Sequence, residues 1–194
     1  SRVLVQNLFS LESLAHVDVL CLDKTGTLTE GNMRVERLVP LAENPPIPLP
    51  EWMGAFLAHS DDNNATFQAM RSYFPNVGST LEPTAQISFS SQRKWSAMTF
   101  PELGTLVVGA PERMTGTVIT DELRAEIRQG KRVLFLACTR EVVQPDRPLP
   151  DMTALAALVL SDPIRSGAAD TLAYFRREGV HVKVISGDHP ATAA

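Results

Sequence analysis

Cysteine is scarce in this sequence of 194 residues, and the two cysteines do not form a closely spaced pair. Cys21 and Cys138 lie far apart, and neither has a second cysteine nearby. A disulfide framework or a cysteine-ligated metal site needs more thiols at shorter spacings. Both cysteines lie in apolar runs, so we expect buried, reduced thiols of the kind found in cytosolic proteins.

Long apolar runs and an excess of positive charge are also missing. The longest purely apolar run covers residues 154–160, whereas a membrane-spanning helix needs about 20 such residues. We therefore expect no part of this chain to be inserted in a membrane. The net charge is -4, which argues against a nucleic-acid-binding surface.

Neither end of the sequence resembles a natural terminus. The chain opens on Ser1 rather than methionine, and "SGDHPATAA" stops where a new helix is expected to begin. We therefore expect a fragment of a longer protein. Its composition, with 44% apolar and 21% charged residues, is that of a globular protein. Its length suits one domain or two small ones.

The apolar patterns predict β-α-β segments at both ends of the chain and a different unit between them. In the end segments we expect strands buried on both faces at residues 17–22, 152–160 and 180–186, and helices at 8–17 and 167–178. Between the proline-rich loops 40–50 and 145–150 we expect helices at 51–59, 65–74 and 121–129 and strands at 85–91, 94–100, 105–110 and 131–139. The prediction is an α/β fold: a partial Rossmann-like domain interrupted by an inserted α+β domain with an antiparallel sheet.

Polar loops that contain an acid follow two of the predicted parallel strands, at residues 23–29 and 186–188. Ligands of open parallel sheets bind beyond the carboxyl ends of the strands. Asp23 is therefore a candidate nucleophile, because a carboxylate forms an acyl phosphate when Mg²⁺ and hydrogen-bond donors neutralise the phosphoryl oxygens. Thr25, Gly26 and Thr27 offer hydroxyl and backbone N–H groups that suit a phosphate. The alternative is that Asp23 only terminates a strand or caps a helix.

Residues 23–29, "DKTGTLT", resemble the phosphorylation motif of P-type ATPases, which are haloacid dehalogenase-like phosphotransferases. Phosphatases of that superfamily carry a second aspartate two residues after the nucleophile, where this chain has Thr25. The resemblance implies that Asp23, Lys24 and Thr25 are catalytic, that Asp23 and Thr25 hold Mg²⁺, and that the aspartyl phosphate persists. The remaining catalytic residues implied by the resemblance, in a loop similar to the family's "TGD", are Ser186, Gly187 and Asp188.

Further segments resemble the nucleotide-binding motifs of the same family. Residues 89–94, "FSSQRK", imply that Phe89 stacks on adenine and that Lys94 lies near the adenine or the phosphates. Arg132, in "GKRVLFLA", is implied to reach the phosphates. The alternatives are core packing for Phe89 and an exposed strand-edge position for Arg132.

Two segments depart from the family pattern. Gly109 opens a loop similar to the family's "KGAPE", but Val108 stands in place of the lysine. Asn64 lies where an adenine-facing glutamate is usual, although an amide still offers hydrogen bonds to a base. We include Gly109 and Asn64 among the nucleotide-binding residues, with a simple turn before a helix as the alternative for both segments.

A hinge motif divides the chain. Asp162–Arg165, "DPIR", is similar to the family's "DPxR" hinge, and the resemblance places Asp162 and Arg165 in the nucleotide site, with Arg165 contacting phosphate when the domains close. The implied domains are residues 1–32 and 163–194 of the phosphorylation domain and residues 33–162 of the inserted nucleotide-binding domain.

The resemblance implies ATP and Mg²⁺ as cofactors and ATP hydrolysis coupled to cation transport in an intact parent. The implied partners are transmembrane and actuator domains of the same parent chain, at the cytoplasmic face of a membrane. The family's later "GDGxND" loop is absent from these residues, so we expect the fragment to bind nucleotide weakly and not to phosphorylate itself. The alternatives are a non-catalytic nucleotide-binding or regulatory module and a haloacid dehalogenase-like phosphatase.

Overall fold

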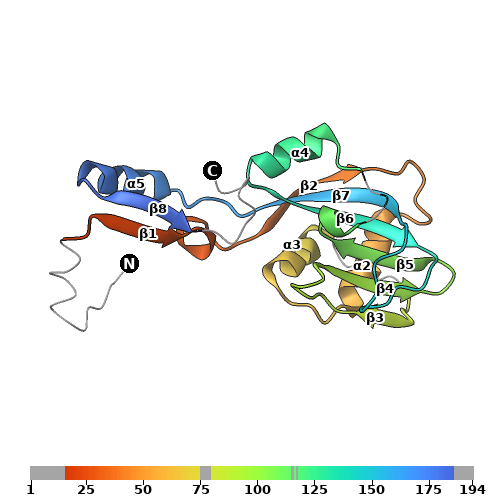
Figure 1. Cartoon of the computed structure of the whole chain (residues 1–194). Helices are drawn as coiled ribbons and strands as arrows, with labels where there is room; N and C mark the ends of the chain where they lie inside the picture. The colour runs from red at the N-terminus through yellow and green to blue at the C-terminus, as the bar shows by residue number, and fades with distance from the viewer. Residues whose placement is uncertain (1–15, 75–79, 115, 117, 186–194) are drawn as a thin grey trace. The chain divides into compact units, whose positions relative to one another are not determined.

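The computed structural model describes residues 16–74, 80–114, 116 and 118–185, and these fall into two compact units (Figure 1). Of the described residues, the smaller unit contains 16–31 and 163–185, and the larger unit contains those between 32 and 162. The helix predicted over residues 8–17 lies almost wholly outside the described residues, and the loop 186–188 lies completely outside them.

The larger unit is built on a six-stranded antiparallel sheet with the strand order β2-β7-β6-β5-β4-β3 (Figure 1). Its strands are β2 (Arg34–Pro40), β3 (Ala85–Ile87), β4 (Trp95–Phe100), β5 (Gly104–Gly109), β6 (Arg132–Thr139) and β7 (Thr153–Ser161). Its helices are α2 (Leu49–His59), α3 (Ala65–Tyr73) and α4 (Asp121–Arg128), with a single 3₁₀ turn, η2 (Pro111–Arg113). Each predicted helix and strand of this unit is therefore present, within a few residues of its expected bounds.

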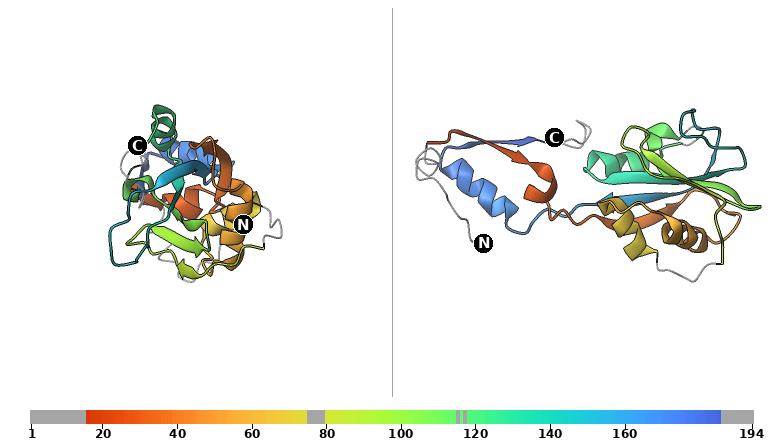
Figure 2. Two further views of the ribbon diagram at one scale, coloured as in Figure 1. Left: turned by 90° about the vertical axis from the view of Figure 1, so that its right-hand side faces the viewer. Right: turned by 90° about the horizontal axis from the view of Figure 1, so that it is seen from below.

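Both faces of this sheet are covered. Trp52 and Phe56 of α2 and Met70 of α3 pack against one face, in a core that also contains Leu158 of β7. Helix α4 lies on the other face of the sheet (Figure 2). Its Leu123 packs there in a second core with Val107, Phe135 and Val159. Neighbouring positions of the central strands thus enter opposite cores, as the two-residue side-chain period of a strand requires.

The two cores explain one wrong prediction. The continuous apolar run of β7 was expected to indicate a parallel strand, but β7 pairs antiparallel with both β2 and β6. A strand covered on both faces has an apolar residue at nearly every position, whichever way its neighbours run. The apolar pattern reports burial, and the direction of pairing depends on how the chain turns between strands.

The smaller unit contains β1 (Val19–Asp23), α5 (Ala168–Arg177) and β8 (His181–Ile185). β1 and β8 pair in parallel, with Asp23 opposite Ile185 at their carboxyl ends, so the predicted parallel pairing is confirmed. Burial on both faces is not found: Val19, Val184 and Cys21 are exposed within the described structure. Two strands and one helix cannot cover both faces of a sheet, which is why the prediction of a buried Cys21 was wrong.

Cys138 agrees better than Cys21 with the prediction of a buried thiol. It lies in β6 of the larger unit and is partly buried, and this burial raises the pKa of its thiol. A raised pKa keeps a thiol in its neutral, unreactive form.

Ion pairs fasten α4 to the edge of the large sheet. Lys131 contacts Glu36 of β2 at 2.6 Å and Glu126 of α4 at 2.9 Å. Arg37 of β2 contacts Glu126 at 2.7 Å and the more exposed Glu122 at 2.8 Å. The hydrogen bond from Lys131, followed by that from Arg37, lowers the pKa of Glu126, and Lys131 likewise lowers the pKa of Glu36.

These lowered pKa values predict a pH dependence of stability. The ordinary pKa of a glutamate carboxyl is 4.5. Above that pH, Glu126 makes its full contribution to the free energy of unfolding. This contribution is lost as the pH falls from 4.5 through the lower pKa of the folded state. We expect Glu126→Gln to reduce the free energy of unfolding at about pH 6 by on the order of 1 kcal/mol, because the pair is partly exposed to water. The difference should shrink towards about pH 3.

Urea unfolding at several pH values checks this prediction. The fluorescence of Trp52 and Trp95 reports on the larger unit, which contains both tryptophans of the sequence. Glu122→Gln is the matched control, since Glu122 makes one exposed pair with Arg37, and we expect it to change stability by a few tenths of a kcal/mol. Equal effects of the two substitutions at all pH values would contradict the prediction.

Candidate functional site

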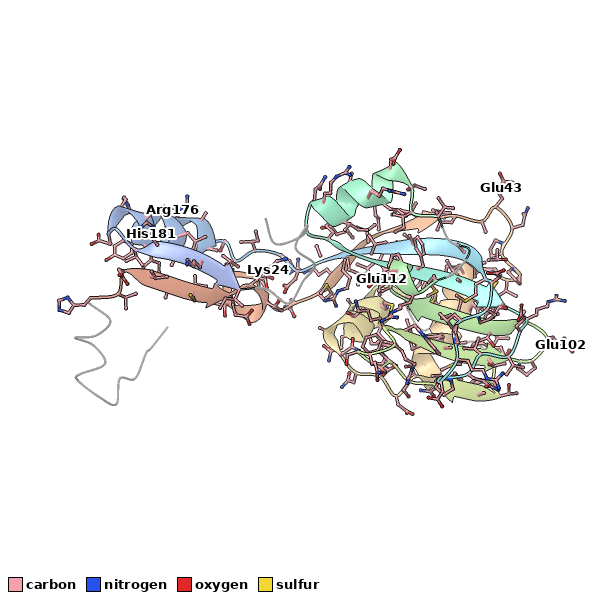
Figure 3. All side chains as sticks on the ribbon, viewed as in Figure 1. Lys24, Glu43, Glu102, Glu112, Arg176 and His181 are labelled. Atoms are coloured by element: carbon pink, nitrogen blue, oxygen red, sulfur yellow. The ribbon has the colours of Figure 1, made fainter. Side chains whose placement is uncertain are left out.

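A tight turn follows the nucleophile candidate at the end of β1. Residues Lys24–Leu28 form a turn in which the backbone of Thr25 and Gly26 is not helical. Gly26 has a φ of 78°, a conformation that glycine adopts without steric strain. Asp23 itself is exposed at the carboxyl end of β1 (Figure 3 labels the neighbouring Lys24). The carboxylate is therefore accessible, as a nucleophile must be.

Thr29 stabilises this turn through hydrogen bonds, and it is only 2% exposed. The Oγ1 atom of Thr29 accepts a hydrogen bond from the Gly26 N–H at 3.0 Å and donates one to the Lys24 carbonyl at 3.3 Å. The Thr29 N–H donates to the same carbonyl at 3.1 Å. Three bonds across this short segment hold the loop, so Thr29 has a structural role that its place in the motif did not reveal.

The hinge motif, residues 162–165, contacts this loop. The Arg165 N–H donates to the Leu28 carbonyl at 2.9 Å, and Ile164 forms a bridge with Thr29. The Arg165 side chain donates from Nε to the Thr27 carbonyl at 3.1 Å and from Nη2 to the Gly26 carbonyl at 3.0 Å. Arg165 thus binds the loop that follows the candidate nucleophile Asp23, whereas the sequence predicts a contact with phosphate.

In the larger unit, Lys94 lies in a strained turn. Its φ is 63°, a left-handed conformation that is uncommon for a residue with a side chain. Its Nζ contacts the carboxylate of Glu112, which Figure 3 labels, at 2.9 Å. Partial burial is the largest single effect and opposes the charged form of Glu112. The hydrogen bond from Lys94, a backbone hydrogen bond and the charges of Lys94 and Arg113 together outweigh it, so the pKa of Glu112 lies below its usual value.

The other nucleotide-binding candidates meet at the start of α3. The side chain of Asn64 caps this helix by accepting bonds from the Thr66 and Phe67 N–H groups. Arg132 donates to the Thr66 hydroxyl at 2.9 Å. The segment 62–66 thereby touches β6, and its predicted base-binding amide is engaged as a helix cap.

Phe89 is joined to the same segment. Its N–H donates to the Asp62 carboxylate at 2.9 Å, and its ring is 40% exposed. An exposed ring is available to stack on a base, in contrast to the alternative of core packing. Asp62 was missed by the sequence analysis, although it is an acid shortly before the Asn64 helix cap.

The strand register places most of these residues at one end of the sheet. Trp95, which follows Lys94, pairs with Gly109, and Gly109 pairs with Phe135 of β6. The Lys94 carbonyl accepts a bond from the Ala110 N–H at 3.0 Å. Lys94, Gly109 and Glu112 are therefore neighbours, and Arg132 begins β6 at the same end.

The substitution at the "KGAPE" lysine has a packing explanation. Val108 is 3% exposed and belongs to the core under α2 and α3. The valine fills that core with an apolar side chain, whereas a lysine would have to extend its ammonium group out to water. The chain thus gains packing where the family pattern has a cation.

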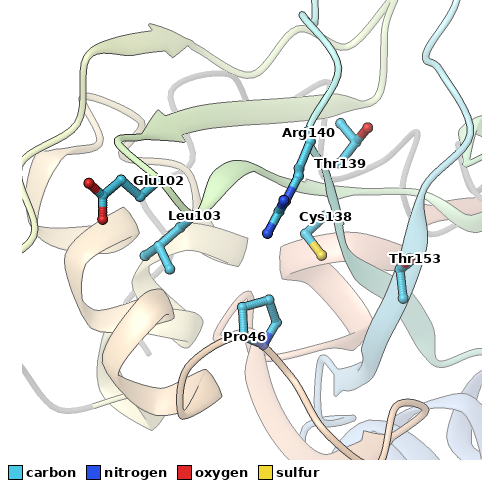
Figure 4. Close-up of a pocket in the computed structure, with 7 residues that line it drawn as sticks. All are labelled: Pro46, Glu102, Leu103, Cys138, Thr139, Arg140 and Thr153. Atoms are coloured by element: carbon cyan, nitrogen blue, oxygen red, sulfur yellow. The ribbon is translucent and has the colours of Figure 1, made fainter.

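A hollow of about 530 Å³ lies at the opposite end of the same sheet (Figure 4). It is lined by Pro46, Glu102, Leu103, Cys138, Thr139, Arg140 and Thr153. None of the predicted nucleotide-binding residues lines it. Among the described residues, no cluster of three or more His, Cys, Asp or Glu side chains is arranged to hold a metal.

Comparison with known proteins identifies the class of this chain. Residues 17–194 match the haloacid dehalogenase-like hydrolases, and the chain belongs to this family. It is 45% identical over 197 residues to the probable cation-transporting ATPase exp7 of Streptococcus pneumoniae serotype 4, covering 100% of this chain and 25% of that protein.

A second relative gives the same result. The calcium-transporting ATPase CtpE of Mycolicibacterium smegmatis is 40% identical over 191 residues, which are 97% of this chain and 24% of that protein. The chain thus spans about a quarter of the length of the curated relatives it matches. The resemblance to P-type cation-transporting ATPases that the motifs indicated is confirmed.

Solved structures agree on the fold. A crystal structure of a zinc-transporting PIB-type ATPase matches with a TM-score of 0.64 at 19% identity, over 95% of this chain and 28% of that one. A crystal structure of such an ATPase in another state matches with a TM-score of 0.54 at 22% identity, over the same shares. These likenesses concern the fold alone, and they confirm the predicted fold class. No helix in the described ranges is long and apolar enough to cross a bilayer.

Gly109 provides a test of the packing at the end of the sheet where the predicted nucleotide-binding residues lie. A Cβ atom at this position would lie 2.5 Å from the Trp95 Cβ and 2.9 Å from the Lys94 carbonyl oxygen. We expect Gly109→Ala to lower the free energy of unfolding by about 1–3 kcal/mol, because β4 must shift to admit the methyl group. Urea unfolding followed by tryptophan fluorescence measures the change.

Ser96→Ala is the control for this experiment. Ser96 also lies in β4 and is buried, and its hydroxyl has no hydrogen-bond partner in the part of the chain that the structure describes. Removing that hydroxyl should be neutral or stabilising. An unchanged stability of Gly109→Ala would show that the close approach of β4 and β5 is not needed for the fold.

Proposed function

We propose that this chain is the phosphorylation and nucleotide-binding region of a P-type ATPase that couples ATP hydrolysis to cation transport. The observation that carries the proposal is the exposed Asp23 carboxylate at the carboxyl end of β1, followed by a loop held by the Thr29 bonds. The family match and the two cation-transporting relatives support it.

In the proposed reaction an Asp23 carboxylate oxygen attacks the γ-phosphorus of ATP. A bond forms between that oxygen and phosphorus, the bond to the β–γ bridging oxygen breaks, and its electron pair leaves with ADP. Water later hydrolyses the acyl phosphate. Thr25 replaces the general acid/base of related phosphatases, so the intermediate persists long enough to drive a conformational change.

Nucleotide binds to the larger unit in this proposal. Phe89 stacks on adenine, and Lys94 and Arg132 attract the phosphates, with Asn64, Gly109 and Asp162 completing the set predicted from sequence for this unit. Arg165, also predicted from sequence, belongs to the smaller unit, where its side chain binds the Gly26 and Thr27 carbonyls. Phe89, Lys94 and Arg132 are all exposed. The Lys94 ion pair with Glu112 must loosen or reorient when phosphate arrives, which is consistent with weak binding by the fragment.

The donor atoms near Asp23 suit Mg²⁺. Asp23 offers a carboxylate, and Thr25 offers hydroxyl and carbonyl oxygens, the hard ligands that this ion prefers. When bound, Mg²⁺ neutralises charge on the transferring phosphoryl group. The predicted Ser186, Gly187 and Asp188 would hold the same group, and Lys24 belongs to the predicted catalytic set.

The proposal includes the parent protein. Residues 1–32 and 163–194 would form the phosphorylation domain and residues 33–162 the nucleotide-binding domain, on the cytoplasmic face of a membrane. Transmembrane and actuator domains of the same parent would respond to phosphorylation of Asp23 by changing access to the cation site. Those domains would determine which cation is transported.

A titration of this chain with ATP tests the nucleotide site. We expect a dissociation constant on the order of millimolar, with shifts of the Phe89 and Lys94 amide signals. Phe89→Ala should weaken binding several-fold, because stacking contributes about 1–3 kcal/mol per base. Tyr73→Ala is the matched control, since the ring of Tyr73 is also 40% exposed. Equal binding by both variants would rule out the stacking role.

A second experiment tests the nucleophile. In a full-length pump that contains this chain, Asp23→Asn should abolish acid-stable radiolabelled phosphate incorporation from ATP, because an amide does not form the acyl phosphate. Nucleotide binding should remain, since Asp23 lies outside the larger unit. Thr84→Ala, an exposed change in the larger unit, is the control. Phosphorylation of the Asp23→Asn variant at the wild-type level would contradict the proposal.

A further inference from the structure

We propose that Arg165 is a positioning residue for the phosphorylation loop: its guanidinium group holds the backbone of residues 26–28 so that Asp23 and the loop N–H groups face the phosphoryl donor. This inference deepens the proposed function and rests on it. It assigns Arg165 a role in the geometry of the nucleophile, in place of the predicted contact with phosphate.

Arg165 contacts three consecutive carbonyl groups. Its Nη2 and Nε atoms bind the carbonyls of Gly26 and Thr27, and its backbone N–H binds that of Leu28. All these atoms belong to the smaller unit. A single residue from the hinge segment therefore determines the direction of three successive peptide groups.

The direction of a carbonyl also determines the direction of an N–H group. In a planar trans peptide, the carbonyl of one residue and the N–H of the next point in opposite directions. With the Gly26 and Thr27 carbonyls bound to Arg165, the N–H groups of Thr27 and Leu28 are directed away from the guanidinium. Oriented N–H groups in a turn of this kind are the donors that bind phosphoryl oxygens.

The carbonyl and the N–H of the peptide between Leu28 and Thr29 also point in opposite directions. The Leu28 carbonyl accepts from the Arg165 N–H, and the Thr29 N–H of that peptide donates to the Lys24 carbonyl. Arg165 on one side and Thr29 on the other therefore hold the loop between them. Gly26, at φ 78°, provides the reversal that lets its carbonyl reach Arg165.

The chemistry favours arginine over lysine at this position. The planar guanidinium presents several N–H donors in a fixed arrangement, and here two of its nitrogens bind adjacent carbonyls. An ammonium group carries the same charge but lacks the planar fork. A role based on charge alone would tolerate lysine, whereas the positioning role would not.

The contact between Arg165 and the loop lies beside the hinge between the two units. Pro163 accepts a bond from the Glu30 N–H at 2.8 Å, and Ile164 bridges to Thr29. The two chain segments that connect the units are thus bonded to each other immediately beside Arg165. A change in the hinge would therefore alter the loop directly, so the loop geometry is linked to the connection with the larger unit.

The decisive experiment compares two phosphoryl donors in the full-length pump. ATP carries a nucleoside and acetyl phosphate does not, and both transfer a phosphoryl group to the same carboxylate. We expect Arg165→Ala to slow acyl-phosphate formation from both donors by the same factor, about 10- to 100-fold, because the nucleophile loop loses its geometry. The KM for ATP should change less than about twofold, since uniform binding is retained, and Arg165→Lys should not restore the rate.

Other results would overturn the inference. Slowing with ATP alone, or a large rise in the KM for ATP, would make Arg165 a nucleotide ligand. A wild-type rate of acyl-phosphate formation in Arg165→Lys would show that Arg165 acts through its charge alone. An unchanged rate in Arg165→Ala would show that Arg165 has no role in the reaction. Arg176→Ala, on α5 (Figure 3), controls for removal of an arginine from the same unit and should leave both rates unchanged.

A measurement on the 194-residue chain tests the contact independently of the reaction. We expect Arg165→Ala to shift the amide signals of residues 26–29 and to leave the ATP-induced shifts of Phe89 and Lys94 unchanged. Unchanged loop signals would overturn the inference even if the pump is active. Failure of the wild-type pump to form an acyl phosphate, with the loop signals shifted as expected, would instead overturn the proposed function.

Discussion

The hydroxyl of Thr29 holds together the loop that follows Asp23. Its buried Oγ1 bonds the Gly26 N–H and the Lys24 carbonyl, which forces the chain to turn directly after β1 and leaves Asp23 at the exposed strand end. Burying a hydroxyl without a hydrogen bond costs free energy, so the bonds to the loop stabilise the buried position of Thr29. Arg165 completes the arrangement from the outer side, through the carbonyls of the same loop.

The larger unit concentrates its polar chemistry at the strand ends for a packing reason. Two apolar cores occupy both faces of its sheet, and this leaves no room on the faces for a charged ligand. The turns at one end gather Lys94, Gly109 and Glu112, with Arg132 at the start of β6. The positive φ of Lys94 is a strained feature of the kind that proteins retain at binding sites.

Much of the fold could be predicted because the relevant signals are local. The helices α2, α3 and α4 and the strands of the larger unit other than β2 follow from apolar spacing and turn residues, and the motif at Asp23 is specific enough to indicate the family. The strand β2 was not predicted. The errors concern features that depend on distant segments. β7 is apolar throughout because two cores cover it, and Cys21 is exposed because the described part of its sheet has only two strands.

The sequence alone determined the class of protein and the candidate nucleophile, because "DKTGTLT" is a contiguous motif whose residues act together within a single turn. Only the tertiary structure decided what Arg165 and Val108 contact. Arg165 meets a loop 138 residues earlier in the chain, and Val108 fills a core shared by two helices and the sheet. Side-chain contacts across such distances depend on how the strands are ordered and paired, and no local pattern of residues records that order.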